Sequence, residues 1–260
     1  MKIVVTGASG ALGTMLSEYL EAQDVQVVTW DRKAVPVNNY KEMEGFLTAT
    51  GPRVVFHLAV ASQPIGQPNE SWQLNYEWAS ELAWLTRALN IRFVFTSSIM
   101  VFTPEKPGPY TIASAPNATE GYGFEKRRAE EQVLKQNPQA IVARLGWQIG
   151  SSSGSNNMID FFERQMQEQG HIAASRVWYP ATSFLEDTAA ALFRLASSAG
   201  GLYQLDSNRR WSFYDIAVAL NARHGGQWII RGNHDFTYDQ RMLDDRVGMP
   251  PLNERLVSLP

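Results

Sequence analysis

The feature that most constrains this chain is a set of three glycines that joins a short apolar run to a helical pattern. The apolar run covers residues 2–5, the helical pattern covers residues 11–22, and the glycines are Gly7, Gly10 and Gly13. Glycine allows a tight turn and lets the backbone approach a phosphate closely, while the amino end of a helix offers free N–H groups. The spacing therefore predicts a strand, a turn and a helix that together bind the pyrophosphate of a dinucleotide.

Apolar runs and helical patterns alternate along the chain as far as about residue 150. The runs that predict strands cover residues 2–5, 25–30, 53–59, 92–96 and 140–145, and the patterns that predict helices cover residues 11–22, 40–49, 72–89 and 122–135. Parallel strands need crossover helices, which cover both faces of their sheet. The alternation therefore predicts an α/β fold with a doubly wound, Rossmann-like parallel sheet.

The chain changes character after residue 150. Residues 151–157 (SSSGSNN) are small and polar, which is typical of a loop or hinge. Beyond them, helical patterns cover residues 159–169, 185–197 and 213–223, and short strand patterns cover residues 202–205 and 228–231. We therefore expect a dinucleotide-binding domain at residues 1–150. A small C-terminal lobe at residues 151–260 is expected mainly to bind substrate, with some of its elements returning to the first domain.

Composition excludes several other classes of protein. Of the 260 residues, 26 are acidic and 23 basic, so no basic surplus exists to neutralise the phosphates of a nucleic acid. Cysteine is absent, and the four histidines lack metal-ligand spacing; His57 lies in an apolar run and is expected to be a core residue. No apolar run approaches the roughly 20 residues that span a bilayer. We expect no nucleic-acid partner, no metal, no membrane contact and a cytoplasmic location.

Two charged residues at the end of the second apolar run bear on the choice of dinucleotide. Asp31 follows Gly13 by 18 residues, close to the spacing at which an acid accepts hydrogen bonds from an adenosine ribose. Asp31 would repel the 2′-phosphate of NADP, whereas Arg32 would hold it. We lean to NAD and keep NADP open. The plainer alternative is a surface carboxylate that follows an ordinary turn.

Three residues have the chemistry of an acid–base site. Tyr122 and Lys126 are four residues apart in a helical pattern, which places the phenol and the ammonium group on one helix face. A nearby ammonium favours phenolate, so we expect Lys126 to lower the pKa of Tyr122 from about 10 toward neutrality. Ser98 lies at the carboxyl end of the fourth strand, where a hydroxyl can hold a substrate carbonyl. An exposed tyrosine–lysine pair is the alternative for this spacing by itself.

These motifs occur in the order found in the extended short-chain dehydrogenase/reductase superfamily. The chain resembles that superfamily over nearly its whole length, through the glycine loop, the TSS that ends at Ser98, and YGFEK at residues 122–126. It most resembles the sugar-nucleotide reductase branch, the dTDP-4-dehydrorhamnose reductases. That closer resemblance is carried by the segments VVTWDR, QLNYEWAS, FVFTSSIMVF, ARLGWQIG and YPATSFLEDTAAAL.

The resemblance implies roles for the residues of both motifs. Tyr122 would be the general acid, and Ser98 the hydroxyl that binds the carbonyl. Lys126 would be both the pKa partner of Tyr122 and a ligand of the cofactor ribose. The three glycines would hold the dinucleotide together with Asp31 and Arg32.

The resemblance also bears on the substrate. Trp147 would lie in the substrate cleft, with a buried core aromatic as an equal alternative, and Thr182 would lie in the segment that closes over the substrate. Asn75 is expected to bond to neighbouring backbone rather than to take part in the chemistry. Where the reductases carry Asp-Tyr after the catalytic hydroxyl, this chain has Ile99 and Met100. That change removes polar contacts from the site and argues against a 4,6-dehydratase.

The activity implied is the NAD(P)H-dependent reduction of a carbonyl on a nucleotide-activated sugar, most like a dTDP-4-keto-6-deoxyhexose. The partner would be such a nucleotide sugar or another small carbonyl compound, and a homodimer is compatible with the sequence. An NAD-dependent sugar-nucleotide epimerase is the alternative enzyme. A non-catalytic, dinucleotide-binding regulatory subunit is the alternative outside the enzymes, because Ile99 and Met100 would suit a site that has lost its chemistry.

Overall fold

The structure is a computed structural model that describes residues 1–61, 69–151 and 156–259. Its contacts divide the chain into two compact units. The first unit consists of Met1–Phe102, Pro116–Arg144 and Ala189–Tyr203, and the second of Thr103–Ala115, Leu145–Thr188 and Gln204–Pro260. Each unit is therefore built from segments that are far apart in the sequence. The assignment of residues 1–150 to cofactor binding and of residues 151–260 to substrate binding stays a prediction.

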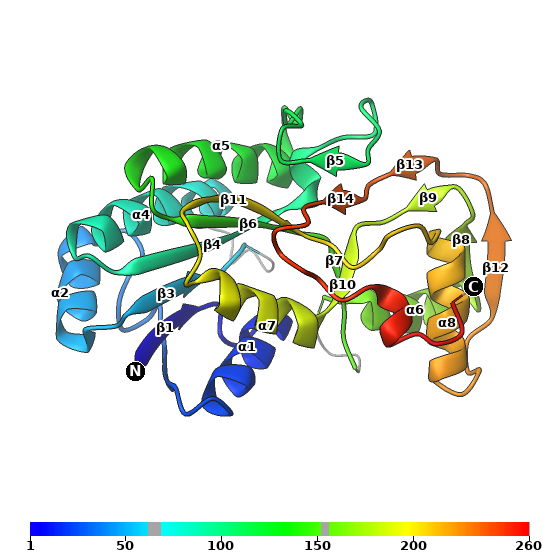
Figure 1. Cartoon of the computed structure of the whole chain (residues 1–260), viewed down its shortest axis with the longest axis horizontal. Helices are drawn as coiled ribbons and strands as arrows, with labels where there is room; N and C mark the ends of the chain where they lie inside the picture. Colours follow the sequence, from blue (N-terminus) through cyan, green and yellow to red (C-terminus); the bar gives the residue numbers. More distant parts are fainter. Residues whose placement is uncertain (62–68, 152–155, 260) are drawn as a thin grey trace. The chain divides into compact units, whose positions relative to one another are not determined.

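A parallel sheet of six strands lies at the centre of the first unit (Figure 1). The strands are β1 (Lys2–Thr6), β2 (Gln26–Thr29), β3 (Val54–His57), β4 (Arg92–Ser98), β6 (Ile141–Leu145) and β11 (Gly201–Leu205), in the spatial order β11-β6-β4-β3-β1-β2. Strand β1 pairs in parallel with both β2 and β3, and β3 pairs in parallel with β4. The carboxyl ends of these strands therefore share one edge. The predicted doubly wound α/β fold is confirmed.

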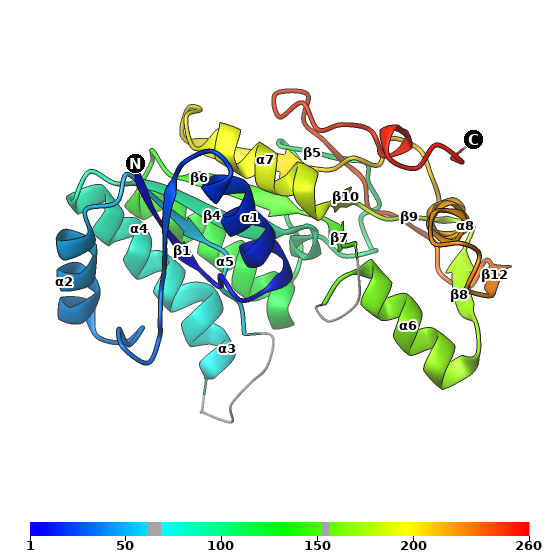
Figure 2. The same cartoon turned by 90° about the horizontal axis from the view of Figure 1, so that it is seen from below.

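Helices cover both faces of this sheet, as Figures 1 and 2 show. They are α1 (Ala11–Glu21), α2 (Tyr40–Thr50), α4 (Trp78–Ala88), α5 (Gly121–Gln136) and α7 (Leu185–Leu195). Helices α1 and α7 lie on one face, where the rings of Tyr19 and Phe193 meet with their centroids 5.9 Å apart. Helices α2, α4 and α5 lie on the other face and share one apolar core, which includes Met43, Trp78 and Ala129.

The helix that the sequence predicts at residues 72–89 is interrupted. The structure has a short helix α3 (Glu70–Trp72), a π-helix η1 (Gln73–Glu77) and then α4. A π-turn adds one residue to a helix, which rotates the residues on either side of it relative to each other. Trp78 is 1% exposed and Trp84 45% exposed, so Trp78 faces the core and Trp84 faces away from it.

The described residues of the second unit form four two-stranded parallel pairs and two main helices. The pairs are β7 (Trp147–Ile149) with β10 (Thr182–Phe184), β8 (Ile172–Ser175) with β12 (Ile230–Asn233), β9 (Trp178–Tyr179) with β13 (Tyr238–Asp239), and β5 (Tyr110–Thr111) with β14 (Met242–Leu243). The helices are α6 (Met158–Gln169) and α8 (Phe213–Arg223), and a short 3-10 turn, η3, covers Leu252–Glu254. The core of this unit is rich in aromatic side chains, among them Phe162, Trp211 and Trp228.

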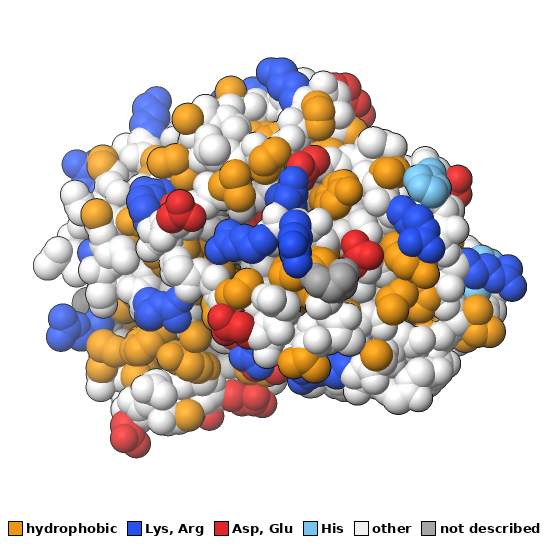
Figure 3. Space-filling model, turned by 45° about the vertical axis from the view of Figure 1, so that its right-hand side comes forward, with side chains coloured by type: hydrophobic (Ala, Val, Ile, Leu, Met, Phe, Trp, Pro, Cys, Tyr) orange, Lys and Arg blue, Asp and Glu red, His pale blue; other side chains and the backbone are white. Residues whose placement is uncertain are grey.

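Two observations bear on membranes and on surface charge. No helix in the described parts of the chain is both long and apolar enough to cross a membrane. On the face shown in Figure 3, acidic side chains are scattered among the basic ones.

Candidate active site

The glycine loop is a tight turn that only glycine can form at two of its three positions. Gly7 has φ +69°, and a Cβ atom there would lie 2.8 Å from the backbone nitrogen of Ala59. A Cβ atom at Gly13 would lie 2.1 Å from the carbonyl oxygen of Gly7. Gly10 is the N-cap of α1, has no side chain to cap the helix, and donates its N–H to Gly7 at 3.1 Å. The amino end of α1 is therefore left open to an anionic ligand.

Asp31 and Arg32 follow β2 at the same edge of the sheet as the glycine loop that follows β1. Both side chains are exposed, as is that of Lys33. One carboxylate oxygen of Asp31 accepts the backbone N–H of Lys33 at 2.9 Å, and the other oxygen has no hydrogen bond within the described structure. One acid and two cations thus stand together where the predicted adenosine ribose would lie. Their contact with a dinucleotide stays a prediction.

Ser98 is the last residue of β4 and caps the 3-10 turn η2 (Ile99–Val101). Its Oγ accepts the N–H of Met100 at 3.1 Å. The Ser98 side chain also forms a hydrogen bond with Tyr122 of α5. The two hydroxyls that the sequence singled out are therefore brought together by the fold, although they are 24 residues apart.

Tyr122 lies in the first turn of α5 and is half-buried. Burial raises the pKa of the Tyr122 phenol to about 12, against a lowering by the hydrogen bond to Ser98 and with a further rise from the charge of Glu125. The expectation that Lys126 brings this pKa toward neutrality is therefore wrong for the chain as it stands. Loss of water around the phenol outweighs the hydrogen bond with Ser98, so the phenol keeps its proton at neutral pH.

Lys126 is fully buried, and its amine lies over an aromatic ring. The Nζ atom lies 4.2 Å from the ring centroid of Phe95 and 5.9 Å from that of Tyr122, and it has no hydrogen bond in the described structure. Burial lowers the pKa of Lys126 to about 7, although the charges of Glu130 and Glu125 raise it. An unpartnered buried amine is costly, so this position suits a polar ligand group that reaches Nζ.

His57 is buried, as expected of a core residue, but only one of its ring nitrogens has a partner. Nδ1 lies 2.8 Å from Oγ1 of Thr6, while Nε2 has no partner in the part of the chain that the structure describes. The ring lies against Trp78 and Phe95. Burial and the charge of Lys126 hold the pKa of His57 well below its usual value, so the ring is neutral.

Trp147 and Thr182 belong to the second unit and lie opposite each other in the β7–β10 pair. Thr182 is fully buried, and its hydroxyl donates to the Trp147 carbonyl at 2.5 Å. Trp147 is half-buried and stacks on Trp178 with ring centroids 5.9 Å apart. The Thr182 hydroxyl thus holds two strands together in this structure. The contact of both residues with a substrate stays a prediction.

Sequence reasoning missed Glu125, which lies between Tyr122 and Lys126 on α5. Its Oε2 accepts hydrogen bonds from Ser71 and Asn75, both at 2.7 Å. Asn75 is 1% exposed and accepts the N–H of Ala61, so one of its bonds is to backbone, as the sequence suggested. Its other two bonds are to the side chains of Ser71 and Glu125. The only signal of Glu125 in the sequence was the presence of a carboxylate between Tyr122 and Lys126.

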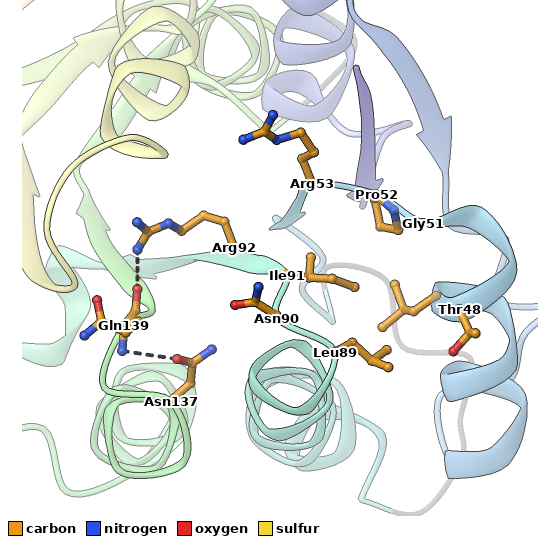
Figure 4. A pocket seen from close by; sticks show the side chains of 11 residues that line it. Thr48, Gly51, Pro52, Arg53, Leu89, Asn90, Ile91, Arg92, Asn137 and Gln139 are labelled. Atoms are coloured by element: carbon orange, nitrogen blue, oxygen red, sulfur yellow. Dashed lines mark hydrogen bonds between the residues drawn. The ribbon is translucent and has the colours of Figure 1, made fainter.

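A further cavity lies away from these residues. It measures about 780 Å³, and its lining includes Arg53, which directly precedes β3, and Arg92, the first residue of β4 (Figure 4). These residues mark the amino edge of the sheet, opposite to the edge that carries Ser98. Arg92 donates to the carbonyl of Gln139 at 2.6 Å, close to the carboxyl end of α5, where a cation is stabilising. The cavity contains none of the predicted catalytic residues.

Known proteins resemble this chain in sequence and in fold. The family model described as "RmlD substrate binding domain" matches residues 1–227. The spore coat polysaccharide biosynthesis protein SpsK of Bacillus subtilis is 21% identical over 88% of this chain and 81% of its own length. The dTDP-4-dehydrorhamnose reductase of Bacillus anthracis, solved with NADP, is 18% identical over 99% of this chain and 98% of its own, with a TM-score of 0.83. WbmH of Bordetella bronchiseptica, solved with NAD+, is 17% identical over 99% and 96%, with a TM-score of 0.79.

Proposed function

The chain belongs to the RmlD substrate binding domain family, and from that membership we propose that it reduces a carbonyl on a nucleotide-activated sugar, with NADH or NADPH as reductant and Tyr122 as proton donor. Extended short-chain oxidoreductases are the enzymes of this family, and the sugar resembles a dTDP-4-keto-6-deoxyhexose. One observation carries the proposal. The Ser98 and Tyr122 hydroxyls meet beside the buried amine of Lys126, which has no hydrogen bond among the described residues.

The residues present fit a dinucleotide. The backbone of Gly7 and Gly13 leaves no room for a side chain, so a pyrophosphate can approach the open amino end of α1. Lys126 Nζ offers its hydrogen-bonding capacity to a ribose hydroxyl, and Asp31 or Arg32 meets the adenosine end. The bound, reduced dinucleotide supplies a hydride to the carbonyl carbon. The lean toward NAD has no support from the solved relatives, because one holds NADP and another NAD+.

Tyr122 and Ser98 act on the carbonyl oxygen. The raised pKa of Tyr122 means that the phenol enters the reaction protonated, which is the form that a donor needs. Ser98 holds the oxygen within reach of the phenol, and its own Oγ is oriented by the N–H of Met100. Transfer of the proton leaves a phenolate, which the Ser98 hydroxyl and the charged form of Lys126 stabilise.

The residues after Ser98 bear on the choice of sugar. Ile99 is 5% exposed and packs into the core, whereas Met100 is 51% exposed. Of the two residues that replace the Asp-Tyr pair, Met100 therefore has the side chain that is accessible to a ligand. An apolar thioether at this place suits the methyl group of a 6-deoxy sugar better than a hydroxyl, because it offers the hydroxyl no hydrogen-bond donor.

Absorbance of the reduced nicotinamide tests the proposal. NADH and NADPH are supplied separately with a panel of nucleotide-activated 4-keto-6-deoxy sugars and simple ketones. Oxidation with a keto-sugar supports the proposed reaction and names the cofactor, while oxidation with simple ketones alone rejects the sugar. Absence of turnover with dinucleotide binding intact rejects the reductase. A cofactor that co-purifies and does not exchange would then indicate the epimerase, and a stable complex with another enzyme would indicate the regulatory subunit.

A further inference from the structure

The π-helix η1 brings a buried amide to the catalytic helix. Asn75 lies at its centre and is 1% exposed. Its Nδ2 donates to Glu125 at 2.7 Å and to Ser71 Oγ at 3.2 Å, and its Oδ1 accepts the N–H of Ala61 at 3.3 Å. Such π-turns are often found at functional sites. Here the turn places the Asn75 amide against the first two turns of α5.

The Glu125 carboxylate is held by donors from the neighbouring helical segment. One of its oxygens, Oε2, accepts both the Ser71 hydroxyl and the Asn75 amide at 2.7 Å. The rings of Trp72 and Phe124 stack beside this contact with centroids 6.3 Å apart. Two short bonds to one oxygen fix the position of the carboxylate, so its negative charge is fixed relative to α5 as well.

That charge acts on both members of the proton-transfer pair. Tyr122 and Glu125 are three residues apart and are neighbours on the helix surface, and Lys126 follows directly. For Tyr122, burial raises the pKa first, and Glu125 raises it further. For Lys126, burial lowers the pKa first, and Glu130 and Glu125 oppose that effect. Glu125 therefore favours the protonated form of both groups.

The other charged groups around Lys126 have different partners. Glu130 binds Arg144 through two hydrogen bonds of 2.7 and 2.8 Å, so the charge of Arg144 compensates it. His57 is neutral, as its low pKa indicates. Within the described residues, Glu125 forms no ion pair with any cation. Its charge is thus the uncompensated one beside the pair.

We propose that Glu125 is a positioning residue that retains the protons of Tyr122 and Lys126, and that Ser71 and Asn75 fix its carboxylate for this purpose. The inference rests on the proposed function for its catalytic meaning. A glutamine at position 125 can accept the same two hydrogen bonds through its amide oxygen but carries no charge. Glu125→Gln therefore separates the charge from the geometry.

The test follows the titration of Lys126 itself, in the full chain without substrate. The protein has six lysines, so selective 13C labelling at lysine Cε gives few NMR signals, and Lys126→Met identifies that of Lys126. In Glu125→Gln we expect the Lys126 midpoint to fall by about one pH unit. Glu131→Gln is the matched control, because Glu131 lies on the same helix in exposed pairs with Arg127 and Arg128. In this control we expect the titration midpoint of Lys126 to equal that in the wild type.

Ser71→Ala provides a second variant. Ser71 is exposed, so its loss spares the core while it frees the carboxylate from one of its two bonds. We expect a smaller fall in the same direction, and this variant decides if Glu125→Gln does not fold. A Lys126 midpoint in the folded variants that matches the Glu131→Gln control would overturn the inference.

Turnover adds an independent readout. With a keto-sugar substrate, the alkaline limb of the kcat–pH profile is expected to move down by about one pH unit in Glu125→Gln, with KM unchanged. If the wild-type enzyme turned over no keto-sugar, the proposed function would be rejected. The NMR titration would still show whether Glu125 acts on the pKa of Lys126. A shifted Lys126 midpoint without any shift in the pH profile would overturn the catalytic meaning of the inference.

Discussion

Gly123 and Met100 approach each other so closely that a Cβ atom at position 123 would lie 2.0 Å from the carbonyl oxygen of Met100. This contact joins the helix that carries Tyr122 to the turn that Ser98 caps. Only glycine allows α5 to pack directly on η2, so the hydrogen bond between the two hydroxyls depends on a residue that has no side chain.

Gly123→Ala is expected to push η2 away from α5. The new methyl group would overlap the backbone of Met100, which can move only if η2 is displaced. The free energy of unfolding should therefore fall by about 1–3 kcal/mol. A displacement of Ser98 by about 1 Å should lower kcat by about two orders of magnitude. Urea unfolding and steady-state kinetics measure the two effects.

Gly45→Ala is the matched control for that substitution. Gly45 lies within α2, and a Cβ atom there would meet nothing within 4 Å. Alanine in a helix interior stabilises the fold by about 0.5–1 kcal/mol relative to glycine, so this variant should gain stability and keep full activity. A Gly123→Ala enzyme that behaves like Gly45→Ala would contradict the role given to the close contact.

Tyr122→Phe is expected to abolish turnover and to leave dinucleotide binding intact. The substitution removes the proposed proton donor but keeps the ring beside Lys126. Turnover is followed by nicotinamide absorbance and binding by fluorescence of the reduced dinucleotide. Tyr19→Phe on α1 is the control, because it also removes one hydroxyl but keeps the ring contact with Phe193. An active Tyr122→Phe enzyme would rule out the phenol as the donor.

The sheet was predictable because buried parallel strands are continuous apolar runs. Residues 54–57 and 93–95 are buried on both faces, and such strands need no alternation of polar and apolar residues. The glycine loop was predictable for a similar reason, since tight turns and close approach leave few alternatives at Gly7 and Gly13. In both cases a local requirement is visible in the residues themselves.

The details of the site depend on tertiary contacts that no local pattern reports. The spacing of Tyr122 and Lys126 indicated a shared face, but not that burial would outweigh their mutual influence on the pKa of the phenol. The π-helix around Asn75 places that side chain against Glu125 on α5. The proposed role of Glu125 depends on hydrogen bonds from residues 50 and 54 positions earlier in the chain. Sequence periodicity fixes neither relation.

The choice between NADH and NADPH is expected to depend on Asp31 and Arg32 in opposite directions. Asp31→Asn removes a negative charge that repels a 2′-phosphate, so the affinity for NADPH relative to NADH should rise by about tenfold. Arg32→Ala should lower that ratio by a similar factor. Dissociation constants for both dinucleotides at two salt concentrations measure the ratio, because exposed charges are screened. If neither variant changes it, neither residue meets the adenosine ribose.

Lys126→Met tests the cost of the buried amine through the pH dependence of stability. Burial lowers the pKa of Lys126 from 10.5 to about 7 in the folded chain, so between those values the unfolded chain binds more protons and stability rises with pH. Below pH 7 the full cost is present, and Lys126→Met should be more stable than the wild type by up to a few kcal/mol. That difference should shrink as the pH rises from 7 to 10.5, which urea unfolding at several pH values measures.

The exposed Lys135→Met provides the control, and a difference between Lys126→Met and the wild type that is constant with pH would contradict the argument. Added dinucleotide should stabilise the wild type more than Lys126→Met, since Nζ then gains its partner.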